Sequence, residues 1–287
     1  MKICDLFKSG KATLSFEVFP PKADSNFETV KSATEEIAAL KPDYMSVTYG
    51  AGGGTSDYTA SIASNILNNY GVTPIAHLSC ITSTKERIET QLSSLKKQGI
   101  ENILALRGDK LPDAPDFQGP YKYASELVEV IKKHGDFCVG GACYPEGHIE
   151  SENSHDDILN LKKKVDAGCD FLTTQMFFDN NILYKFLYKI GQAGINVPVV
   201  AGIMPVTNVA QIKRICSISG NALPQKFLRI VDRFENDPQA LKQAGIAFAT
   251  EQIIDLFANG INAVHIYSMN KPDVAEQIQA NLSEIIK

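Results

Sequence analysis

Along this chain, short runs of apolar residues alternate with stretches in which apolar and polar positions recur at a helical period. The runs are rich in β-branched and aromatic residues, a composition that predicts buried strands. Eight such runs occur, at 13–19, 44–49, 73–80, 102–107, 137–144, 171–177, 197–204 and 263–269. In the stretch after the first run, Phe27, Val30, Ile37 and Leu40 fall on one face of a helix.

The near-continuous apolar character of the runs is typical of a parallel sheet covered by helices. No stretch rich in Pro, Gly or Ser separates the strand–helix units, so the pattern predicts one domain over residues 1–287, an α/β fold of the (β/α)₈ TIM barrel type. The seventh unit is longer than the others, with helical patterns at 208–219, 224–234 and 238–259. A doubly wound open sheet is the competing architecture, and a two-domain chain is a further alternative.

Signals at the helix ends refine this pattern. Ser83 and Ser154 are each followed three residues later by an acid, the spacing of a capping box, which predicts that helices begin at these serines. Gly99 and Gly168 follow helical patterns and precede strands, where C-terminal caps occur.

Composition narrows the class of protein. Apolar residues make up 44% and charged residues 21%, as in soluble globular proteins, and the net charge of −5 gives no indication of nucleic acid or an anionic membrane as partner. No apolar run reaches the roughly 18 residues of a membrane span, and the first residues lack the layout of a signal peptide. The six cysteines are scattered without a C-x-x-C pair, which is typical of a reduced compartment. We therefore expect a cytoplasmic protein.

Glu17 lies inside the first apolar run, in Ser15-Phe16-Glu17-Val18-Phe19-Pro20-Pro21. A carboxyl group buried there loses hydration, so its pKa should rise toward neutrality unless a cation pairs with it. A carboxyl group with a raised pKa is suited to general acid catalysis. The alternatives are a side chain that faces solvent at the strand end and an ion pair with a buried Lys or Arg.

Further polar residues gather toward the carboxyl ends of the predicted strands, where barrel enzymes have their active sites. They are Glu17, Thr48, Tyr49, His77, Arg107, Asp109, Tyr144, Glu146, Gln175 and Tyr267. Chance would place such residues at both ends of the strands, so their one-sided distribution favours a functional interpretation of Glu17.

Some of these residues have simpler explanations. His77 fits a core histidine whose hydrogen bonds are satisfied, and Arg107-Gly108-Asp109 fits a local ion pair on a turn. Gln175 is harder to explain in this way, because a buried amide needs several hydrogen-bond partners and a ligand with mixed donors and acceptors would supply them.

The glycine-rich segment 50–55 follows a strand and precedes a helix, but it lacks the glycine spacing and the lysine of phosphate-binding loops. We interpret it as a flexible barrel loop that could serve as a substrate lid. No pair of His and carboxylate has metal-ligand spacing, and no G-x-S-x-G motif is present, so we expect neither a metal site nor a serine hydrolase.

The predicted helix after the fifth strand carries Asp157, Asn160 and Lys164 on one face. This polar stripe borders the apolar stripe of Ile158 and Leu161 instead of opposing it. Such a stripe is ordinarily a partly solvated flank, but beside a barrel mouth it could hold the ribose and phosphates of a nucleotide.

Eight segments of the chain resemble, in order, the signature segments of one known family. They are Ser15–Pro21, Thr48–Ala51, Ala76–Cys80, Leu106–Asp109, Tyr144–Glu146, Asn160–Gly168, Thr174–Asp179 and Gly202–Val206. The family is methylenetetrahydrofolate reductase, and the length of the chain resembles that of its bacterial members, which consist of the catalytic barrel alone.

The resemblance implies FAD as a non-covalent cofactor at the barrel mouth, and reduction of 5,10-methylenetetrahydrofolate to 5-methyltetrahydrofolate for methionine synthesis or other one-carbon metabolism. It implies NADH or NADPH as hydride donor, with an electron-donating partner protein as the alternative, and a homo-oligomer. The FAD contacts that it implies are Thr48, His77, Arg107, Gly108, Asp109, Tyr123, Ala124, Ala142, Tyr144, His148, Asp157, Asn160 and Lys164. The implied catalytic residues are Glu17, Asp109 and Gln175, and the substrate contacts are Glu17, Gln175, Gln211 and Lys271.

The implied reaction explains these residue types. Methylenetetrahydrofolate accepts a hydride once its five-membered ring opens to a 5-iminium cation, which requires a proton at N10. A neutral Glu17 can assist that transfer, an ionised Asp109 favours the cation, and Gln175 can pair with the pterin edge. Use of one flavin face by donor and acceptor in turn would give ping-pong kinetics.

The sequence departs from the family pattern at Ile215, where a phenylalanine is usual, at Lys271, where an arginine is common, and in the glycine-rich segment 50–55. Two hypotheses from other classes remain. One is a cofactor-free barrel lyase or aldolase with a Schiff-base lysine, although no strand-end lysine in an apolar pocket supports it. The other is a non-catalytic flavin-binding subunit that passes electrons to a partner within a larger one-carbon complex.

Overall fold

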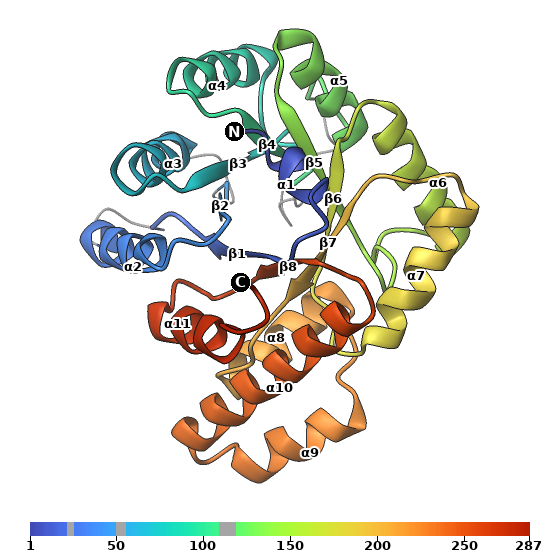
Figure 1. Ribbon diagram of the computed structural model, residues 1–287. Coiled ribbons are helices and arrows are strands. Elements are labelled where there is room, and N and C mark those ends of the chain that lie inside the picture. Colours follow the sequence, from blue (N-terminus) through green and yellow to red (C-terminus); the bar gives the residue numbers. More distant parts are fainter. Residues whose placement is uncertain (22–25, 50–55, 109–118) are drawn as a thin grey trace.

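The computed structural model describes residues 1–21, 26–49, 56–108 and 119–287, and its centre is a closed barrel of eight parallel strands in sequence order (Figure 1). The strands are β1 (Thr13–Val18), β2 (Tyr44–Val47), β3 (Thr73–Ser79), β4 (Asn102–Leu106), β5 (Cys138–Cys143), β6 (Phe171–Thr174), β7 (Val199–Ile203) and β8 (Ala263–Ile266). Each predicted run contains one strand, and β8 pairs with β1 to close the ring. The predicted TIM barrel is therefore confirmed, and the open doubly wound sheet is wrong.

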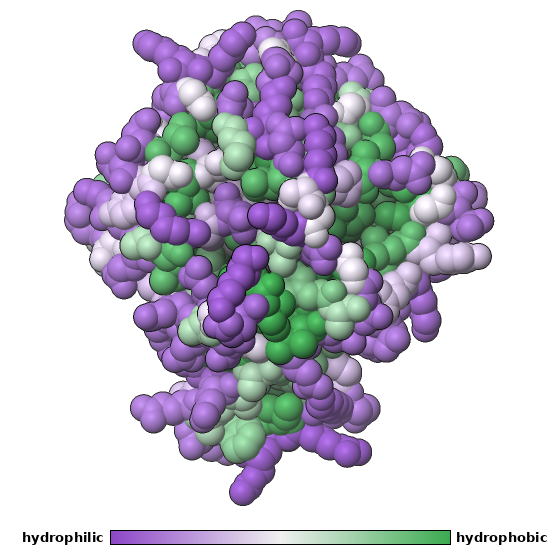
Figure 2. Space-filling model, in the orientation of Figure 1, coloured by the Kyte–Doolittle hydropathy of each residue, from purple (hydrophilic) through white to green (hydrophobic). Residues whose placement is uncertain are grey.

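The helices lie around this barrel, as Figure 1 shows. They are α1 (Ile3–Phe7), α2 (Phe27–Ala39), α3 (Ser56–Tyr70), α4 (Lys85–Lys97), α5 (Ala124–His134), α6 (Ser154–Asp166), α7 (Asn180–Gln192), α8 (Val209–Ser219), α9 (Gln225–Phe234), α10 (Pro238–Ala258) and α11 (Pro272–Asn281). Along the part of the chain that is described, no helix is long and apolar enough to cross a membrane. On the face shown in Figure 2, hydrophilic side chains dominate, and hydrophobic patches appear between them.

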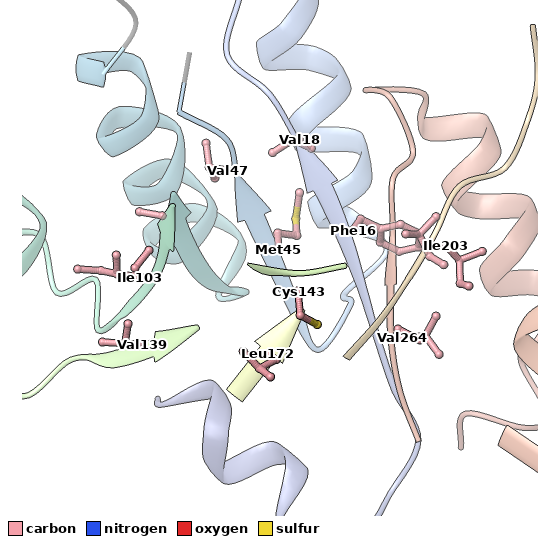
Figure 3. Close-up of a cluster of buried hydrophobic side chains, with 14 of the residues drawn as sticks. Phe16, Val18, Met45, Val47, Ile103, Val139, Cys143, Leu172, Ile203 and Val264 are labelled. Carbon is pink, nitrogen blue, oxygen red and sulfur yellow. The ribbon is translucent and has the colours of Figure 1, made fainter. Parts of the chain in front are cut away.

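The main core lies between the outer surface of the barrel and the helices. Alternate strand residues point outward into this layer, and Figure 3 shows Phe16, Met45 and Ile203 among them. All three side chains are completely buried. Burial of this kind contributes roughly 25 cal/mol per Å² of apolar surface, and it is the main source of the stability of the barrel.

The helix α1 covers the amino-terminal end of the barrel, and the sequence pattern did not predict it. Ile3 packs with Tyr44, Leu104 and Phe171 from the lower barrel interior. The Ile3 amide donates to Asn102 Oδ1 at 2.8 Å, which ties the helix to the start of β4. A helix of five residues is too short to display a period, so only its contacts reveal it.

The helices α8, α9 and α10 form the predicted long unit between β7 and β8. They enclose a second, smaller core that includes Met204, Ile212 and Phe227. Gly245 in α10 lies so close to the chain after β7 that a Cβ there would stand 1.8 Å from the Val206 carbonyl oxygen. The backbone of α10 is thus in direct contact with the backbone of the segment that follows β7.

Two of the predicted helix starts are wrong by one residue. Thr84, not Ser83, caps α4 by accepting a hydrogen bond from the Arg87 amide, because the Ser83 hydroxyl donates to the Ser79 carbonyl at 2.9 Å. Asn153, not Ser154, caps α6 through its side-chain oxygen. The predicted glycine caps are confirmed, since Gly99 and Gly168 have φ angles of +74° and +119°, in the region that favours glycine.

Candidate active site

The strand register places the inward-facing side chains in layers of four, each layer drawn from alternate strands. The layer near the carboxyl end holds Glu17, His77, Ala142 and Gly202. Above it, at the mouth, lie Thr48, Leu106, Gln175 and Tyr267, and below it Ser46, Leu104, Thr173 and His265. The predicted strand-end residues Glu17, His77, Thr48, Gln175 and Tyr267 thus meet at one end of the barrel.

Glu17 is an acid that the barrel largely removes from solvent. Its side chain is 18% exposed, and burial raises the pKa of its carboxyl group to about 8. Within the described ranges, no Lys or Arg lies within ion-pair distance of it. The expected upward shift is therefore supported, and a buried Lys or Arg as partner is not found.

His77 faces Glu17 across the barrel interior, with Nε2 3.9 Å from Glu17 Oε2. Burial lowers the pKa of His77 to about 3, so acid and imidazole are both uncharged at neutral pH. His77 Nε2 is buried and has no hydrogen-bond partner in the described part of the protein. The described residues therefore do not supply the hydrogen bonds of a satisfied core histidine, and the unpaired nitrogen is suited to a ligand.

The raised pKa of Glu17 predicts a pH-dependent stability. In the unfolded chain the carboxyl group titrates near its ordinary value of 4.5. Below that pH it is protonated in both states, and between about pH 4.5 and 8 only the unfolded state ionises, so stability falls as pH rises. We expect Glu17→Gln to be more stable than the wild type at pH 9 by up to about 5 kcal/mol, and equal to it near pH 4. Urea unfolding at both pH values measures this, and a constant difference would contradict it.

Arg107 and Gly108 form the rim beside β4. Arg107 makes a bidentate ion pair with Glu150, at 2.7 Å for both bonds. Gly108 has a φ of +88°, and a Cβ there would stand 2.1 Å from Ser79 Oγ, so only glycine fits. One partner of Arg107 is thus an acid 43 residues away, which the sequence pattern did not indicate. Asp109 and the segment 50–55 lie outside the described residues.

Lys164 brings a cation to the rim beside β5. Its side chain lies along Gly141, and its Nζ donates to the Ala142 carbonyl oxygen at 2.6 Å. Burial lowers its pKa, and within the described ranges no carboxylate lies within ion-pair distance. Two of the three ammonium hydrogens therefore remain for a ligand.

The other two residues of the predicted polar stripe on α6 differ in their exposure to solvent. Asp157 is half-buried and accepts hydrogen bonds from the Ser151 hydroxyl at 3.0 Å and the His148 amide at 3.4 Å. Asn160 is exposed and accepts from Lys163. The structure therefore places Asp157 and Lys164 toward the site and leaves Asn160 in solvent.

The remaining predicted cofactor contacts lie after β5 and at the start of α5. Tyr144 and His148 pack edge to face with ring centres 4.6 Å apart, and burial lowers the pKa of His148. Tyr123 is exposed at the start of α5, where its neighbour Ala124 is buried.

The predicted substrate contacts lie on the β6 to β8 side. Gln175 Oε1 accepts from the Met176 amide at 3.0 Å, which leaves its amide nitrogen available. Gln211 and Ile215 lie one turn apart on α8 and are half-buried. Lys271 donates to Thr207 Oγ1 at 2.5 Å, and burial lowers its pKa.

Sequence reasoning missed Glu150, His265 and Ser46. His265 and Ser46 are buried in the layer below Glu17 and hydrogen-bonded to each other. Two apolar runs carry polar residues at alternate positions, Ser15 with Glu17 and His265 with Tyr267. Because alternate strand residues point to the same side, this pattern could have indicated that Ser15 and His265 face the barrel interior.

Fold and site together define a (β/α)₈-barrel protein whose mouth combines a partly buried acid of raised pKa with a partly buried lysine. The family model of methylenetetrahydrofolate reductase matches residues 2–283, and the chain belongs to this family.

Curated relatives agree with this assignment. The chain is 35% identical over 269 residues to the 5,10-methylenetetrahydrofolate reductase of Escherichia coli (strain K12), covering 94% of this chain and 90% of that protein. It is 36% identical over 303 residues to methylenetetrahydrofolate reductase (NADH) 1 of Arabidopsis thaliana, covering 99% of this chain and 51% of that protein. The chain thus spans about half of the plant relative and most of the bacterial one.

Among solved structures, an uncharacterized protein from Clostridium thermocellum that binds two copies of 5-methyl-5,6,7,8-tetrahydrofolic acid aligns with a TM-score of 0.63. The alignment covers 96% of this chain and 98% of that one at 14% identity, which supports the fold alone.

Proposed function

We propose that this protein reduces 5,10-methylenetetrahydrofolate to 5-methyltetrahydrofolate, with a hydride that passes from NAD(P)H through FAD. The observation that carries the proposal is Glu17, an acid held neutral by burial at the mouth of the barrel, in a chain of this family. An acid of this kind is what opening of the folate ring requires.

The described residues fit an FAD molecule at the mouth. Lys164 has ammonium hydrogens left for a phosphate. His77 Nε2 is a buried polar atom that lacks a partner within the described ranges. Together with Arg107 and Asp157, these residues would hold the cofactor.

When bound, FAD would supply the hydride transfer between the nicotinamide donor and the folate. Glu17 would donate the proton to folate N10, directly or through a water, which opens the five-membered ring to the 5-iminium cation. The amide nitrogen of Gln175, for which the described residues offer no acceptor, would donate to the pterin edge and orient the methylene carbon. Asp109 is proposed to remain ionised and to stabilise the cation.

An anaerobic spectroscopic experiment tests the function. Purified protein should show flavin absorption, lose it on addition of NADH, and regain it on addition of methylenetetrahydrofolate. A colourless protein that binds no FAD would overturn the proposal, as would a flavin that the donor reduces but the folate does not reoxidise. The second outcome would favour an electron-transfer subunit.

Lys164→Ala is expected to weaken FAD binding by about 1–3 kcal/mol, the range for hydrogen bonds to charged groups. The control is Lys162→Ala on the same helix, because Lys162 forms an ion pair with Asp166. A fluorescence titration of the apoprotein with FAD measures both. Equal losses in the two variants would mean that net charge matters, and not the position of Lys164.

Ile215→Phe is expected to lower the Michaelis constant for NADH, by about tenfold at most. Ile215 is half-buried on α8, and an aromatic side chain there would add a stacking surface worth roughly 0.5–1.5 kcal/mol. Steady-state NADH oxidation by the isolated wild type should be measurable but weak. Tight NADH use that Ile215→Phe leaves unchanged would show that this position does not set donor affinity, and inertness relieved by a co-purifying protein would establish a partner as donor.

A further inference from the structure

His265 on β8 links two strands directly beneath the Glu17 layer. Its imidazole is 3% exposed, with Nδ1 2.7 Å from Ser15 Oγ on β1 and Nε2 3.0 Å from Ser46 Oγ on β2. The ring is packed between Tyr44, stacked at 6.0 Å, and Tyr267, edge-on at 5.4 Å. The imidazole is therefore fixed in both position and orientation.

A second partner of Ser15 indicates the direction of the two hydrogen bonds of His265. The Ser15 hydroxyl donates to the Val264 carbonyl oxygen at 3.1 Å, which favours the tautomer in which Ser15 Oγ accepts from His265 Nδ1–H. Burial lowers the pKa of His265 to about 3, so the ring carries a single hydrogen and Nε2 must be an acceptor. The Ser46 hydroxyl therefore donates to Nε2. Within the described ranges Ser46 Oγ has no other hydrogen bond.

Ser46 is also the neighbour of Glu17 in the barrel wall. The two residues are register partners on adjacent strands, and both side chains point inward. Side chains paired in this way on one face of a sheet are within reach of each other. A Ser46 hydroxyl free to rotate could donate to the Glu17 carboxylate and stabilise its charged form.

We propose that His265 is a positioning residue for the catalytic acid: by binding the hydroxyl hydrogen of Ser46, it leaves only oxygen lone pairs facing Glu17 and so keeps Glu17 protonated. This inference rests on the proposed function in one respect, namely that the proton held on Glu17 is the one given to the folate. The arrangement of Ser15, His265 and Ser46 itself does not depend on that function.

Within the described part of the chain, the titratable groups that face Glu17 are uncharged at neutral pH. They are His77 on β3, His265 and Tyr267 on β8, and, lower in the barrel, Tyr44 on β2; burial lowers the pKa of both histidines and raises the pKa of both tyrosines. Asp109 lies outside the described residues. Burial is thus the cause of the raised pKa of Glu17, and the direction of one neighbouring hydroxyl can change it by a measurable amount.

Two substitutions separate the contacts of His265. In His265→Asn the side-chain amide occupies the place of Nδ1, which keeps a partner for Ser15 and releases Ser46. In His265→Gln the amide oxygen can reach the place of Nε2, which keeps an acceptor for Ser46 and releases Ser15. Because the two variants have similar polarity and both lose the ring, they are matched controls for packing.

The measurement is an NMR titration of protein labelled with ¹³C at the glutamate carboxyl groups, with the Glu17 signal identified by its absence in Glu17→Gln. We expect the Glu17 pKa to fall by about one to two pH units in His265→Asn, the equivalent of one hydrogen bond to a charged group. It should stay at the wild-type value in His265→Gln. The double variant His265→Asn with Ser46→Ala should return to the wild-type value, because no hydroxyl remains to donate.

Ser15→Ala tests the same inference while the ring stays in place. Without Ser15 the imidazole hydrogen can move to Nε2 and bind Ser46 Oγ, which frees the Ser46 hydroxyl, so the Glu17 pKa should again fall. Equal shifts in His265→Asn and His265→Gln, or a shift that persists when Ser46 is alanine, would overturn the proposal. The titration needs no turnover, so a protein that fails to reduce folate but shows these shifts would refute the proposed function and leave the role of His265 intact.

Discussion

Glu17→Gln is expected to slow the reduction of methylenetetrahydrofolate by roughly 10²-fold or more, the scale of a lost general acid. Glutamine has nearly the size of the protonated acid and can occupy the same site beside His77. It cannot release a proton to N10, so the folate ring should stay closed. The reaction with the hydride donor needs no acid from Glu17, so it should proceed at close to the wild-type rate.

Stopped-flow traces of the two half-reactions separate these effects. The reductive trace follows loss of flavin absorption after NADH is added, and the oxidative trace follows its return with the folate. His77→Asn is a useful comparison, because it alters the side chain that faces Glu17 and leaves the acid in place. Near-normal reoxidation in Glu17→Gln would show that the proton comes from another group.

Gly245→Ala is expected to destabilise the protein by about 3 kcal/mol or more, at the upper end of the cost of overpacking. The added Cβ would meet backbone, the carbonyl oxygen of Val206 at 1.8 Å and its carbon at 2.7 Å. Backbone cannot rotate away as a flexible side chain can, so α10 or the segment after β7 must shift. Urea unfolding followed by circular dichroism measures the loss.

The matched control is Gly191→Ala in α7, because no atom lies within 4 Å of a Cβ built at Gly191. Alanine is favoured over glycine within a helix by about 1 kcal/mol, so this variant should be as stable as the wild type or slightly more so. A loss at Gly191 as large as that at Gly245 would mean that both effects arise from helix propensity or expression and not from close packing.

The strands could be predicted from the sequence, because a run such as 73–80 is buried on both faces and is therefore mostly apolar. Glu17 could be predicted for the same reason, since a charged residue type within such a run stands out. The short helix α1 and the ion pair of Arg107 with Glu150 could not. The helix is shorter than two periods, and the pair joins residues 43 positions apart, which only the fold brings together.

The hydroxyl–imidazole arrangement beneath Glu17 was also hidden. Serine is common in strands and at turns, so Ser15 and Ser46 carry no distinctive pattern. His265 is hydrogen-bonded to two residues that are 250 and 219 positions away in sequence. Site residues could thus be predicted from the sequence where they interrupt an apolar run, as Glu17 does. Residues whose partners are brought together only by closure of the barrel, such as His265, could not.

That closure also constrains how the chain reaches its native state. The register of β1 with β8 pairs Thr13 with Ala263, so the last contact of the ring joins nearly the two extremes of the chain. Until β8 has been synthesised and docked, β1 and β7 present unpaired strand edges, which are prone to associate with other chains. Contacts of such long sequence separation also slow folding. A growing chain of this protein therefore remains vulnerable to aggregation until the segment after α10 has left the ribosome.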